Sequence, residues 1–390
     1  MTWKLTVKLL SPVCLVQNRG VGNTLPTLDY IPGSTVRGLL AQLYLEQPGC
    51  SADANFRDLF INEVVSYPNL YPEGAQVIPF SALTCKYHPG FGTMNDIHGA
   101  VDGVLPWLRH QFNSQVPLEE LAKVCQWEGC GAPLDRLNGY YLVAGGSERQ
   151  VTVKKRLLAR TAILETLEVA KSGDLYSLEV LQEGQEFLGD LAAPSDKVQQ
   201  LLALLATQSR GWLGTARSRG LGEVELSLAE EEDTASYTVG QRLAGFNAGL
   251  HQDGRLRCFN LTLLSDAIVL DELLGYRCQP LIEDLKLAVG VTGKSVLDEF
   301  RLFTAWSGVQ RLSGWQAAWK LPKPEEQAIR RGSVFVFGLN RIDQALDSQQ
   351  ISEVVKILAD LERNGLGERP AEGFGRLRVC HEFHWENPFK

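Results

Sequence analysis

Three cysteines and two histidines in the first half of the sequence are of the types that bind zinc. Cys125 and Cys130 form a C-x-x-x-x-C pair in CQWEGCGAPL, and Cys85 stands upstream in LTCKYHPG with His88 close behind it. His98 follows in DIHGAVDG. Thiolates and imidazoles hold zinc tetrahedrally, so a complete site would take the three cysteines and one histidine. Unmetalled thiols packed in a core are the alternative interpretation.

These residues fall in a stretch, 80–145, that looks inserted between the recognisable elements of the first half of the chain. The stretch is small and loop-rich and has few apolar residues, so a metal would act there as an internal staple. The predicted role of the zinc is therefore structural. The residues alone leave open which of the two histidines completes the site.

Two other stretches combine clustered glycines with arginines and run into an alternating segment. They are GWLGTARSRGLGEVEL at 211–226 and GLGERPAEGFGRLRV at 365–379. Glycine amides can approach a phosphate backbone closely, and arginine forks match phosphate geometry. The candidate contacts are Arg210, directly before the first stretch, Gly214, Arg217, Arg219, Gly220 and Gly222 within it, and Gly365, Gly367, Arg369, Gly373, Gly375 and Arg376 in the second. Flexible turns with solvated arginines are the alternative.

Neither stretch fits a nucleotide-binding loop. A P-loop requires a lysine followed by serine or threonine, and no such pair closes either stretch. A dinucleotide fingerprint runs strand, glycines, helix, whereas the order here is helix, glycines, strand. An extended RNA strand therefore suits these loops better than a single nucleotide does.

A basic run lies in QVTVKKRLLAR, where Lys154, Lys155, Arg156 and Arg160 are opposed locally only by Glu148. Alternation along a strand would send some of these side chains to each face. We expect a hairpin that lies against bound RNA. A solvated hairpin edge, where lysine discourages aggregation, is the alternative.

The histidines near the C-terminus do not form a catalytic site by their spacing. His381 and His384 in VCHEFHWE are three residues apart, which on a strand places them on opposite faces. We expect both at the surface or at an edge of a sheet. The sequence offers no paired carboxylates and no nucleophile with an evident base, so it favours binding over catalysis.

The elements that must position these residues repeat in the two halves of the chain. Residues 3–9 alternate as a strand, IPGSTVRGLLAQLYLE predicts a helix capped by Ser34 or Thr35, and SDKVQQLLALLATQ predicts a helix capped by Ser195. In the second half, ISEVVKILADLERN predicts a helix and 377–383 a closing strand. Each half thus has an opening strand, a helix, a glycine loop and a closing strand, which indicates an internal duplication.

Length and composition are those of a globular protein with two or three domains. The chain has 390 residues, of which 44% are hydrophobic and 22% charged, and its net charge is −8. We predict a first domain over 1–228, a connector over 229–254 and a second domain over 255–390. An acidic total argues against indiscriminate coating of nucleic acid but permits a local basic groove.

The sequence also predicts the compartment. No apolar run approaches the ~20 residues that span a bilayer, and the N-terminal segment alternates instead of forming the core of a signal peptide. Eight scattered cysteines are typical of reduced thiols with one metal site. We therefore expect a cytoplasmic protein with no membrane partner.

Several fragments resemble the RAMP superfamily of CRISPR RNA-binding proteins. YIPGSTVRGLL is similar to the start of their first helix, where a P-G-S-x-x-R-G pattern recurs, and RTAILETLEVAKSGDLYSLEVLQEGQEFLGDL is similar to their mid-domain hairpin. In the second half, NLTLLSDAIVL, SGWQAAWKLPKP and AIRRGSVFVF resemble the handle-binding subunits of type III effector complexes, those of subtype III-D above all. The resemblance is discontinuous but touches both halves.

The resemblance implies an α+β fold of two tandem ferredoxin-like (RRM-like) domains, with the zinc-bearing segment inserted in the first. It implies a non-catalytic subunit that binds the 5′ repeat-derived tag of the guide RNA (crRNA) and caps the backbone filament in antiviral defence. Its partners would be adjacent backbone RAMP subunits and the large signalling subunit, with target RNA nearby. Ser34 and Arg37 join the glycine loops as implied RNA contacts, and His98 is preferred to His88 as the fourth zinc ligand.

A metal-independent endoribonuclease that processes precursor guide RNA is the alternative, because that family shares the architecture. In its members a histidine in or beside the first helix usually acts as general base. Residues 33–46 contain no histidine, and none appears before His88, which favours the binding role.

Overall fold

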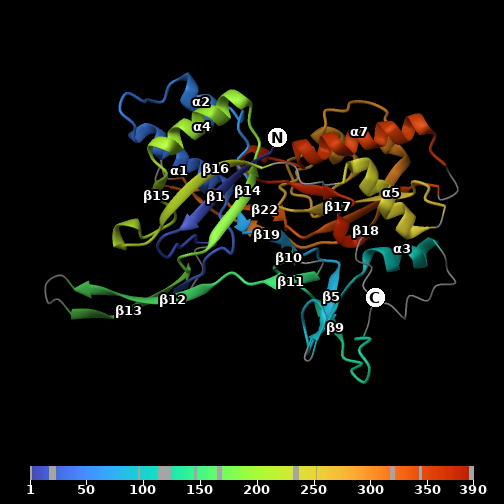
Figure 1. Cartoon of the computed structure of the whole chain (residues 1–390), viewed down its shortest axis with the longest axis horizontal. Coiled ribbons are helices and arrows are strands. Elements are labelled where there is room, and N and C mark those ends of the chain that lie inside the picture. The colour runs from blue at the N-terminus through green and yellow to red at the C-terminus, as the bar shows by residue number, and fades with distance from the viewer. Residues whose placement is uncertain are drawn as a thin grey trace.

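The computed structural model describes residues 2–16, 23–94, 97–112, 124–144, 147–164, 169–231, 237–251, 253–316, 321–341 and 345–385. Two antiparallel sheets carry most of the helices, one sheet in each half of the chain (Figure 1). Short strands around β5 and β9 lie below them in this view, and a long hairpin extends to the left. Among the described residues no helix is long and apolar enough to cross a membrane.

The first unit is ferredoxin-like. Its core elements in chain order are β1 (Thr2–Leu9), α1 (Gly33–Glu46), β3 (Tyr71–Pro72), β14 (Glu186–Leu191), α4 (Ser195–Thr207) and β16 (Glu223–Glu231). Within the sheet the strands stand in the order β16-β1-β14-β3, and all neighbours are antiparallel. A short strand, β15 (Arg210–Trp212), extends the edge beside β16. The split β-α-β crossovers that this order requires define the ferredoxin-like topology.

The second unit repeats the same plan. Its core elements are β17 (Cys258–Leu263), α6 (Ile282–Ala288), β18 (Phe300–Trp306), β23 (Val334–Leu339), α7 (Ser348–Asn364) and β24 (Leu377–Val379). The sheet order is β18-β23-β17-β24, again antiparallel throughout, which is the order of the first sheet read from its other edge. The α+β fold with two tandem ferredoxin-like units is therefore confirmed, and so is the duplication.

Each sheet buries a hydrophobic core against its helices. Alternation along β1 turns Leu5, Val7 and Leu9 into one core with α1 and α4, as the period-two pattern predicts. All residues of β17 and β23 are buried, so the second sheet is covered on both of its faces. The central strands of the second unit are consequently unavailable to a ligand.

The insertion into the first unit is larger than the predicted 80–145, because the chain leaves the core sheet after β3 and returns only at β14. It contains β4 (Gln76–Val77), β5 (Ala82–Cys85), β6 (Thr93–Met94), β7 (Ile97–His98), β8 (Ala100–Asp102), α3 (Val104–Phe112), β9 (Leu134–Arg136), β10 (Tyr140–Ala144), β11 (Ser147–Val151), β12 (Lys155–Leu164) and β13 (Val169–Leu181). The β12–β13 hairpin projects from the body of the molecule (Figure 1). The predicted zinc segment and the predicted basic hairpin thus belong to one insertion.

Smaller elements complete the chain. They are β2 (Thr24–Leu25), α2 (Ala54–Phe60), α5 (Val239–Leu250), β19 (Val309–Leu312), β20 (Trp315–Gln316), β21 (Leu321–Pro322), β22 (Glu326–Ile329) and the short 3-10 turns η2 (Arg217–Arg219), η3 (Val296–Glu299), η4 (Pro370–Glu372) and η5 (Glu382–His384). Helix α5 lies inside the predicted connector 229–254 and packs Leu243, Phe246 and Leu250 into the second core. This part of the predicted connector is therefore an ordered element packed on the second core, while residues 232–236 of it lie outside the described residues.

The predicted helix caps are also wrong. Helix α1 begins at Gly33 behind Pro32, and α4 begins at Ser195 behind Pro194, with no side-chain cap hydrogen bond at either end. An extended proline supplies the first helical carbonyl in both cases, since Pro32 O accepts from the amide of Val36 at 3.2 Å. The predicted closing strand 377–383 ends early as well, at Val379.

Candidate RNA interface and metal centre

The two glycine loops have matching backbones from Gly214 to Gly222 and from Gly367 to Gly375. Gly214, Gly220 and Gly222 correspond to Gly367, Gly373 and Gly375, and all six have positive φ. Each loop contains one left-handed non-glycine residue, Ala216 at φ 58° or Arg369 at φ 56°, followed by a 3-10 turn. The duplication seen in the sheets therefore extends to the loops.

Matching hydrogen bonds fix both loops to their opening strands. The first pair closes each loop on itself: Leu213 N donates to Gly222 O at 2.8 Å, and Leu366 N donates to Gly375 O at 2.9 Å. The second pair joins each loop to a carbonyl: Thr215 N donates to Cys14 O at 3.0 Å, and Glu368 N donates to Ile268 O at 2.8 Å. The third pair joins it to a serine: Glu223 N donates to Ser11 Oγ and Arg376 N donates to Ser265 Oγ, both at 2.8 Å. A serine and a carbonyl that follow the first strand of each unit thus hold the loop that precedes its last strand.

The glycines are required by this packing. A Cβ on Gly222 or Gly375 would overlap the carbonyl oxygen of Leu213 or Leu366, and the backbone there has positive φ. Their amides donate to Pro12 O and Asp266 O, each at 2.8 Å. The amides of Gly220, Gly365 and Gly373 also donate to backbone carbonyls, so they are not aimed at a ligand. Most of the glycine amides that the sequence predicted as phosphate donors therefore already donate to backbone carbonyls.

The turn of the first loop faces solvent. Arg217, Ser218 and Arg219 are exposed. Arg217 donates to Gly214 O at 3.1 Å and to Gln42 Oε1 at 3.2 Å, and Arg219 donates to Tyr176 Oη at 2.6 Å. Within the described part of the chain no carboxylate pairs with either arginine. The loop therefore presents two uncompensated guanidinium groups.

Arg210 and Trp212 flank this loop on β15. Arg210 is mostly exposed and lies 3.5 Å from Glu225 across the strand pair. Trp212 is 45% exposed, which leaves its ring available for stacking. Both side chains belong to a strand, because Arg210 and Trp212 pair with β16 instead of remaining in the predicted loop.

The turn of the second loop is buried against the first unit. Tyr67 N donates to Ala371 O and Ser66 Oγ donates to Pro370 O, both at 3.0 Å. Asn69 Oδ1 accepts from Gly33 N at 2.9 Å just beside it. This loop is a contact between the two units, and its turn has no exposed basic face.

The arginines predicted for the second loop are correspondingly occupied. Arg37 on α1 pairs with Glu372 at 3.0 Å, and Arg369 pairs with Glu326. Arg376 donates to Ser66 Oγ at 3.3 Å and to Asp190 O at 3.4 Å. Ser34 is half-buried in the first turn of α1. RNA contacts by these residues stay a prediction. An RNA phosphate would have to compete with the protein groups that Arg37, Arg369 and Arg376 already contact.

The hairpin β12–β13 carries the predicted basic run next to the first loop. Lys154 and Arg156 are exposed, while Lys155 reaches Thr27 O at 2.9 Å and Glu179 at 3.3 Å. Arg156 pairs with Glu183 at 3.1 Å. Arg160 stands opposite Tyr176 in the strand register, and Tyr176 is the residue that Arg219 contacts. Hairpin and loop are therefore in contact at Tyr176, with Arg160 beside that contact.

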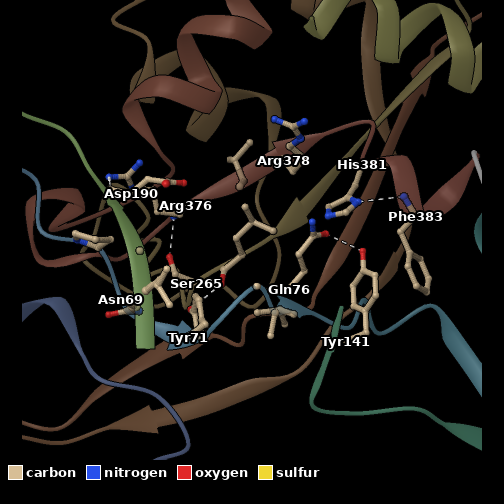
Figure 2. A pocket seen from close by; sticks show the side chains of 18 of the residues that line it. Asn69, Tyr71, Gln76, Tyr141, Asp190, Ser265, Arg376, Arg378, His381 and Phe383 are labelled. Atoms are coloured by element: carbon tan, nitrogen blue, oxygen red, sulfur yellow. Dashed lines mark hydrogen bonds between the residues drawn. The ribbon is translucent and has the colours of Figure 1, made fainter. Parts of the chain in front are cut away.

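A large groove of about 770 Å³ lies where the two units and the insertion meet (Figure 2). It is lined by residues of β1, β14, β10 and β24, with Gln76, Tyr141, Arg378 and His381 among the side chains that face it. Tyr141 donates to Gln76 Oε1 at 2.8 Å. The lining mixes apolar and polar side chains, and charged residues in it are paired, Lys4 with Asp190 and Arg378 with Glu382, both at 2.6 Å. It offers no basic track for a nucleic acid.

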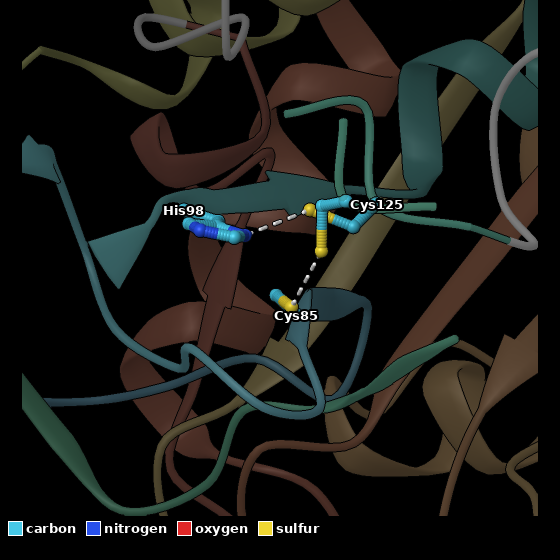
Figure 3. Close-up of side chains that lie close together, drawn as sticks. Cys85, His98 and Cys125 are labelled. Atoms are coloured by element: carbon cyan, nitrogen blue, oxygen red, sulfur yellow. Dashed lines mark hydrogen bonds between the residues drawn. The ribbon is translucent and has the colours of Figure 1, made fainter. Parts of the chain in front are cut away.

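The structure brings the four predicted metal ligands together (Figure 3). Cys85 ends β5, His98 ends β7, and Cys125 and Cys130 come from the segment before β9. Their ligand atoms all lie within 4.8 Å of one another. Cys85 Sγ is 3.8 Å from Cys130 Sγ, and Cys125 Sγ is 3.4 Å from His98 Nδ1.

These spacings fit a tetrahedral zinc site. With Zn–S of about 2.3 Å and Zn–N of about 2.0 Å, the tetrahedral edges are about 3.8 Å between sulfurs and about 3.5 Å between sulfur and nitrogen. Burial alone would raise the pKa of Cys85, but hydrogen bonds from the backbone N–H groups of Tyr87 and His88 and contacts with the Cys130 and Cys125 thiols together lower it, whereas burial raises the pKa of Cys125. A thiolate is the form that zinc binds, so the donor set suits the metal.

His98 is held in a column of rings. His88 stacks on one side with ring centroids 4.1 Å apart, and Trp127 stacks nearly parallel at 4.9 Å. Only His98 of the two candidate histidines belongs to the ligand group, while His88 lies against its ring. The stack orients the imidazole so that Nδ1 faces Cys125, as a supporting shell of contacts commonly does at metal sites.

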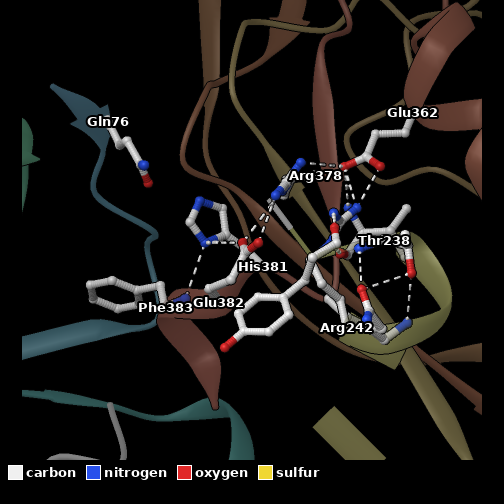
Figure 4. Close-up of polar contacts among 12 residues, drawn as sticks. Gln76, Thr238, Arg242, Glu362, Arg378, His381, Glu382 and Phe383 are labelled. Atoms are coloured by element: carbon white, nitrogen blue, oxygen red, sulfur yellow. Dashed lines mark hydrogen bonds and ion pairs between the residues drawn. The ribbon is translucent and has the colours of Figure 1, made fainter. Parts of the chain in front are cut away.

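A network of ion pairs borders the groove on the side of the second unit (Figure 4). Buried Arg242 pairs with Glu362 at 2.5 Å and donates to Val379 O at 2.8 Å. Arg378 pairs with Glu382 at 2.6 Å and lies 3.6 Å from Glu362. These residues connect α5, α7 and β24, which gives the network a structural role.

His381 and His384 are buried, contrary to the prediction of surface positions. They are 5% and 2% exposed, because the chain turns inward after Cys380, whose φ is 45°. Burial, and next the neighbouring His384, lower the pKa of His381 to about 3. Strand alternation could not reveal this turn.

His384 joins the insertion to the second sheet. Its Nδ1 lies 3.0 Å from Asp102 Oδ2, and its Nε2 lies 2.8 Å from Thr262 Oγ1. Ser81 Oγ donates to the other Asp102 oxygen. The series of acid, imidazole and hydroxyl has the composition of a hydrolytic triad, but Thr262 is fully buried, so no substrate reaches it. No spacing in the sequence signals this contact.

Comparisons with known proteins give remote likenesses. No protein-family model matches the sequence, and no curated protein matches it significantly. Among solved structures, the chain is similar to one from type III-B Cmr-beta bound to cognate target RNA and AMPPnP, with a TM-score of 0.41 and 14% identity over 85% of this chain and 86% of that one.

A second Cmr-beta structure, bound to cognate target RNA, gives a TM-score of 0.40 and 13% identity over 91% of this chain and 94% of that one. A Cas6 product complex gives a TM-score of 0.30 and 14% identity over 51% of this chain and 80% of that one. At these scores the fold is defined by the strand order of the two sheets and not by the likeness.

Proposed function

We propose that the protein is a non-catalytic RNA-binding subunit of a type III CRISPR effector complex, of the III-D kind. It binds the 5′ repeat-derived tag of the crRNA and caps the backbone filament in the cytoplasm. The observation that carries the proposal is the exposed, uncompensated arginine turn of the first glycine loop, in a chain whose motifs resemble RAMP proteins in both halves. Adjacent backbone subunits and the large signalling subunit are its protein partners, with target RNA nearby.

The chemistry of this surface suits single-stranded RNA. Arg217 and Arg219 provide forks for phosphates, and their neighbours Arg160 and Tyr176 continue the surface onto the hairpin. Trp212 offers a ring on which an unstacked base can lie. Phosphate contacts set the register of the strand, and ring stacking holds splayed bases.

Replacing Arg217 and Arg219 with alanine tests this surface. We expect affinity for tagged RNA to fall roughly tenfold per arginine, and the slope of log K against log salt to flatten by about 0.7 for each phosphate that is no longer bound. Binding is measured by fluorescence anisotropy at several salt concentrations. Arg363→Ala is the control, because Arg363 is 73% exposed on α7 and pairs with Asp360 there. Equal slopes in all three proteins would refute the proposal.

Two further experiments address the remaining parts of the function. Copurification followed by sequencing of bound RNA should return guide RNAs that carry the repeat-derived tag. Incubation of the isolated protein with repeat RNA should leave that RNA intact. Specific cleavage that a His88→Ala or His98→Ala variant abolishes would establish the processing endoribonuclease instead.

We further propose that Cys85, His98, Cys125 and Cys130 bind one structural Zn²⁺. The ion would supply no chemistry of its own and would tie the strands of the insertion together. We expect about one zinc per chain by metal analysis, as a single site of this ligand set holds one ion. Cys130→Ser should lose it and lower the melting temperature, whereas Cys278→Ser, at an exposed cysteine, should change neither. Zinc-free wild-type protein would exclude the site.

A further inference from the structure

Two arginines from distant parts of the chain stand over the same phenylalanine ring. The guanidinium carbon of Arg136, at the end of β9, is 4.4 Å from the centroid of Phe80. That of Arg330, which directly follows β22, is 5.6 Å from the same centroid. Both arginines are exposed. The two charges are therefore at most about 10 Å apart, within a Debye length at 0.1 M salt.

The ring beneath them is fixed. Phe80 is 4% exposed, and its backbone N–H donates to Gly332 O at 2.6 Å. A Cβ added to Gly332 or Gly308 would come within 3.0 or 3.1 Å of ring atoms, so both glycine backbones lie against it. Arg330 N donates to Gly308 O at 2.8 Å. The insertion and the second unit thus hold the Phe80 ring and the backbone of Arg330 in place before any ligand binds.

The charge of this pair is not balanced by the protein. Within the described part of the chain no carboxylate forms an ion pair with Arg136 or Arg330. Their neighbour Arg331, in contrast, pairs with Asp29 at 2.6 Å and lies 3.6 Å from Asp266. Burial and then the charge of Arg330 lower the pKa of Arg136, and the nearby Asp135 opposes them only in part. Two like charges held together favour an anion beside them.

We infer that Arg136 and Arg330 form a clamp for one phosphate, and that its ligand is a phosphodiester of single-stranded RNA. The inference rests on the proposed function for the source of that phosphate. The two guanidinium carbons lie 4.4 and 5.6 Å from the centroid of the Phe80 ring, and each exposed group can present its N–H donors to phosphate oxygens. The clamp is separate from the arginine turn of the first glycine loop, and it extends the RNA contacts to the insertion and the second unit.

The salt dependence of binding tests the clamp in the full-length protein. Tagged RNA and an untagged oligouridine are titrated against wild type, Arg136→Gln, Arg330→Gln and the double variant. We expect each single variant to bind about tenfold more weakly and to flatten the salt slope by about 0.7, the value for one phosphate on a single strand. The double variant should equal a single one, because both arginines share the same phosphate.

Arg311→Gln is the matched control. Arg311 lies on β19, which pairs with β22; it is 72% exposed and 3.9 Å from Glu325. This substitution removes the same charge, so a wild-type slope in the variant assigns the effect to the clamp. Arg136→Lys should restore the slope but only part of the affinity, since lysine keeps the charge and loses the fork.

The outcomes separate the clamp from the function. Wild-type slopes in both clamp variants, an equal change in Arg311→Gln, or additive losses in the double variant would each overturn the clamp. If oligouridine binding depends on the clamp but tagged RNA has no advantage, the clamp stands and the tag-binding function falls. If wild type binds neither RNA, both are wrong.

Discussion

His381 lies in the turn that follows β24, where its Nδ1 accepts a hydrogen bond from the Phe383 N–H at 3.1 Å. With Nδ1 as acceptor, the proton of the neutral ring is on Nε2. Burial and His384 lower its pKa from 6.5 to about 3, so the ring is neutral at physiological pH. Between pH 3 and pH 6.5 this histidine is protonated in the unfolded chain but not in the folded chain. The free energy of unfolding therefore rises with pH over this range.

The acid titration of stability therefore contains a contribution from His381. We expect the free energy of unfolding to fall below pH 6.5 by up to about 1.4 kcal/mol per pH unit on account of His381. His381→Gln should remove that part of the slope, because glutamine can accept the same hydrogen bond without titrating. Urea unfolding at pH 7, 6 and 5 measures it, with exposed His251→Gln as control. Identical pH slopes in wild type and His381→Gln would contradict the assignment.

Some residues of the site follow from the sequence and others do not. Residue type and the resemblance together select all four members of the metal group, because cysteine and histidine have few other reasons to cluster. The ion pairs of Arg37 and Arg369 could not be predicted from the sequence, since their partners Glu372 and Glu326 come from other elements. Arg330 next to Arg331 shows the same limit, as only the fold decides which of two adjacent arginines is paired.

At the scale of elements, the cost of replacing a glycine in these loops depends on what its added Cβ would contact. Gly375 has φ 71° and its Cβ would overlap the Leu366 carbonyl, whereas Gly220 has φ 79° with open space beside it. Both substitutions to alanine carry the cost of the left-handed backbone, about 1 kcal/mol. Only the first adds a collision with the main chain.

We expect Gly375→Ala to lower the free energy of unfolding by roughly 2–4 kcal/mol, and Gly220→Ala by about 1 kcal/mol. Denaturant unfolding of the two variants and wild type gives the comparison. Gly220→Ala is matched in backbone conformation, so the difference isolates the overlap with Leu366. Equal losses in the two variants would mean that the loop relaxes around the added methyl group.

Local periodicity in the sequence predicted the helices and strands that bury one face. The apolar stripes of α4 and α7 and the alternation of β1 are confirmed, because a helix or strand with one buried face imposes its period on the sequence. Strand β3, with two residues, and β15, with three, exist only through pairing with β14 and β16. Long-range pairing of this kind leaves no local signal, and the true extent of the insertion was hidden for the same reason.

At the scale of the whole molecule, Glu372 binds the second unit to the first. Its carboxylate pairs with Arg37 of α1 at 3.0 Å and lies 3.6 Å from Lys323 and 3.9 Å from the Arg369 guanidinium. Burial alone would raise its pKa from 4.5, but Lys323, Arg37 and Arg369 outweigh burial and lower it. The stabilisation is thus present above pH 4.5 and is lost as the pH falls through the lowered value.

Glu372→Gln should therefore weaken the contact at neutral pH, because the partly buried cations Arg37 and Lys323 lose a carboxylate and Arg369 keeps only Glu326. We expect a loss of about 1–3 kcal/mol in the free energy of unfolding at pH 7, and a smaller difference from wild type below pH 4.5. Glu325→Gln, at a carboxylate that is 70% exposed, serves as control. A difference that persists unchanged at low pH would show that the carboxylate charge is not what joins the units.

The shared frame of the two glycine loops has a consequence for how such proteins diverge. The glycines and the carbonyls of Cys14 and Ile268 fix the shape, so the three residues of the intervening turn are free to vary. One copy carries Arg-Ser-Arg and meets solvent, while the other carries Pro-Ala-Glu and meets a neighbouring unit. The same scaffold thus presents an exposed basic turn in one copy and a turn that contacts protein in the other, and the two turns differ in all three residues.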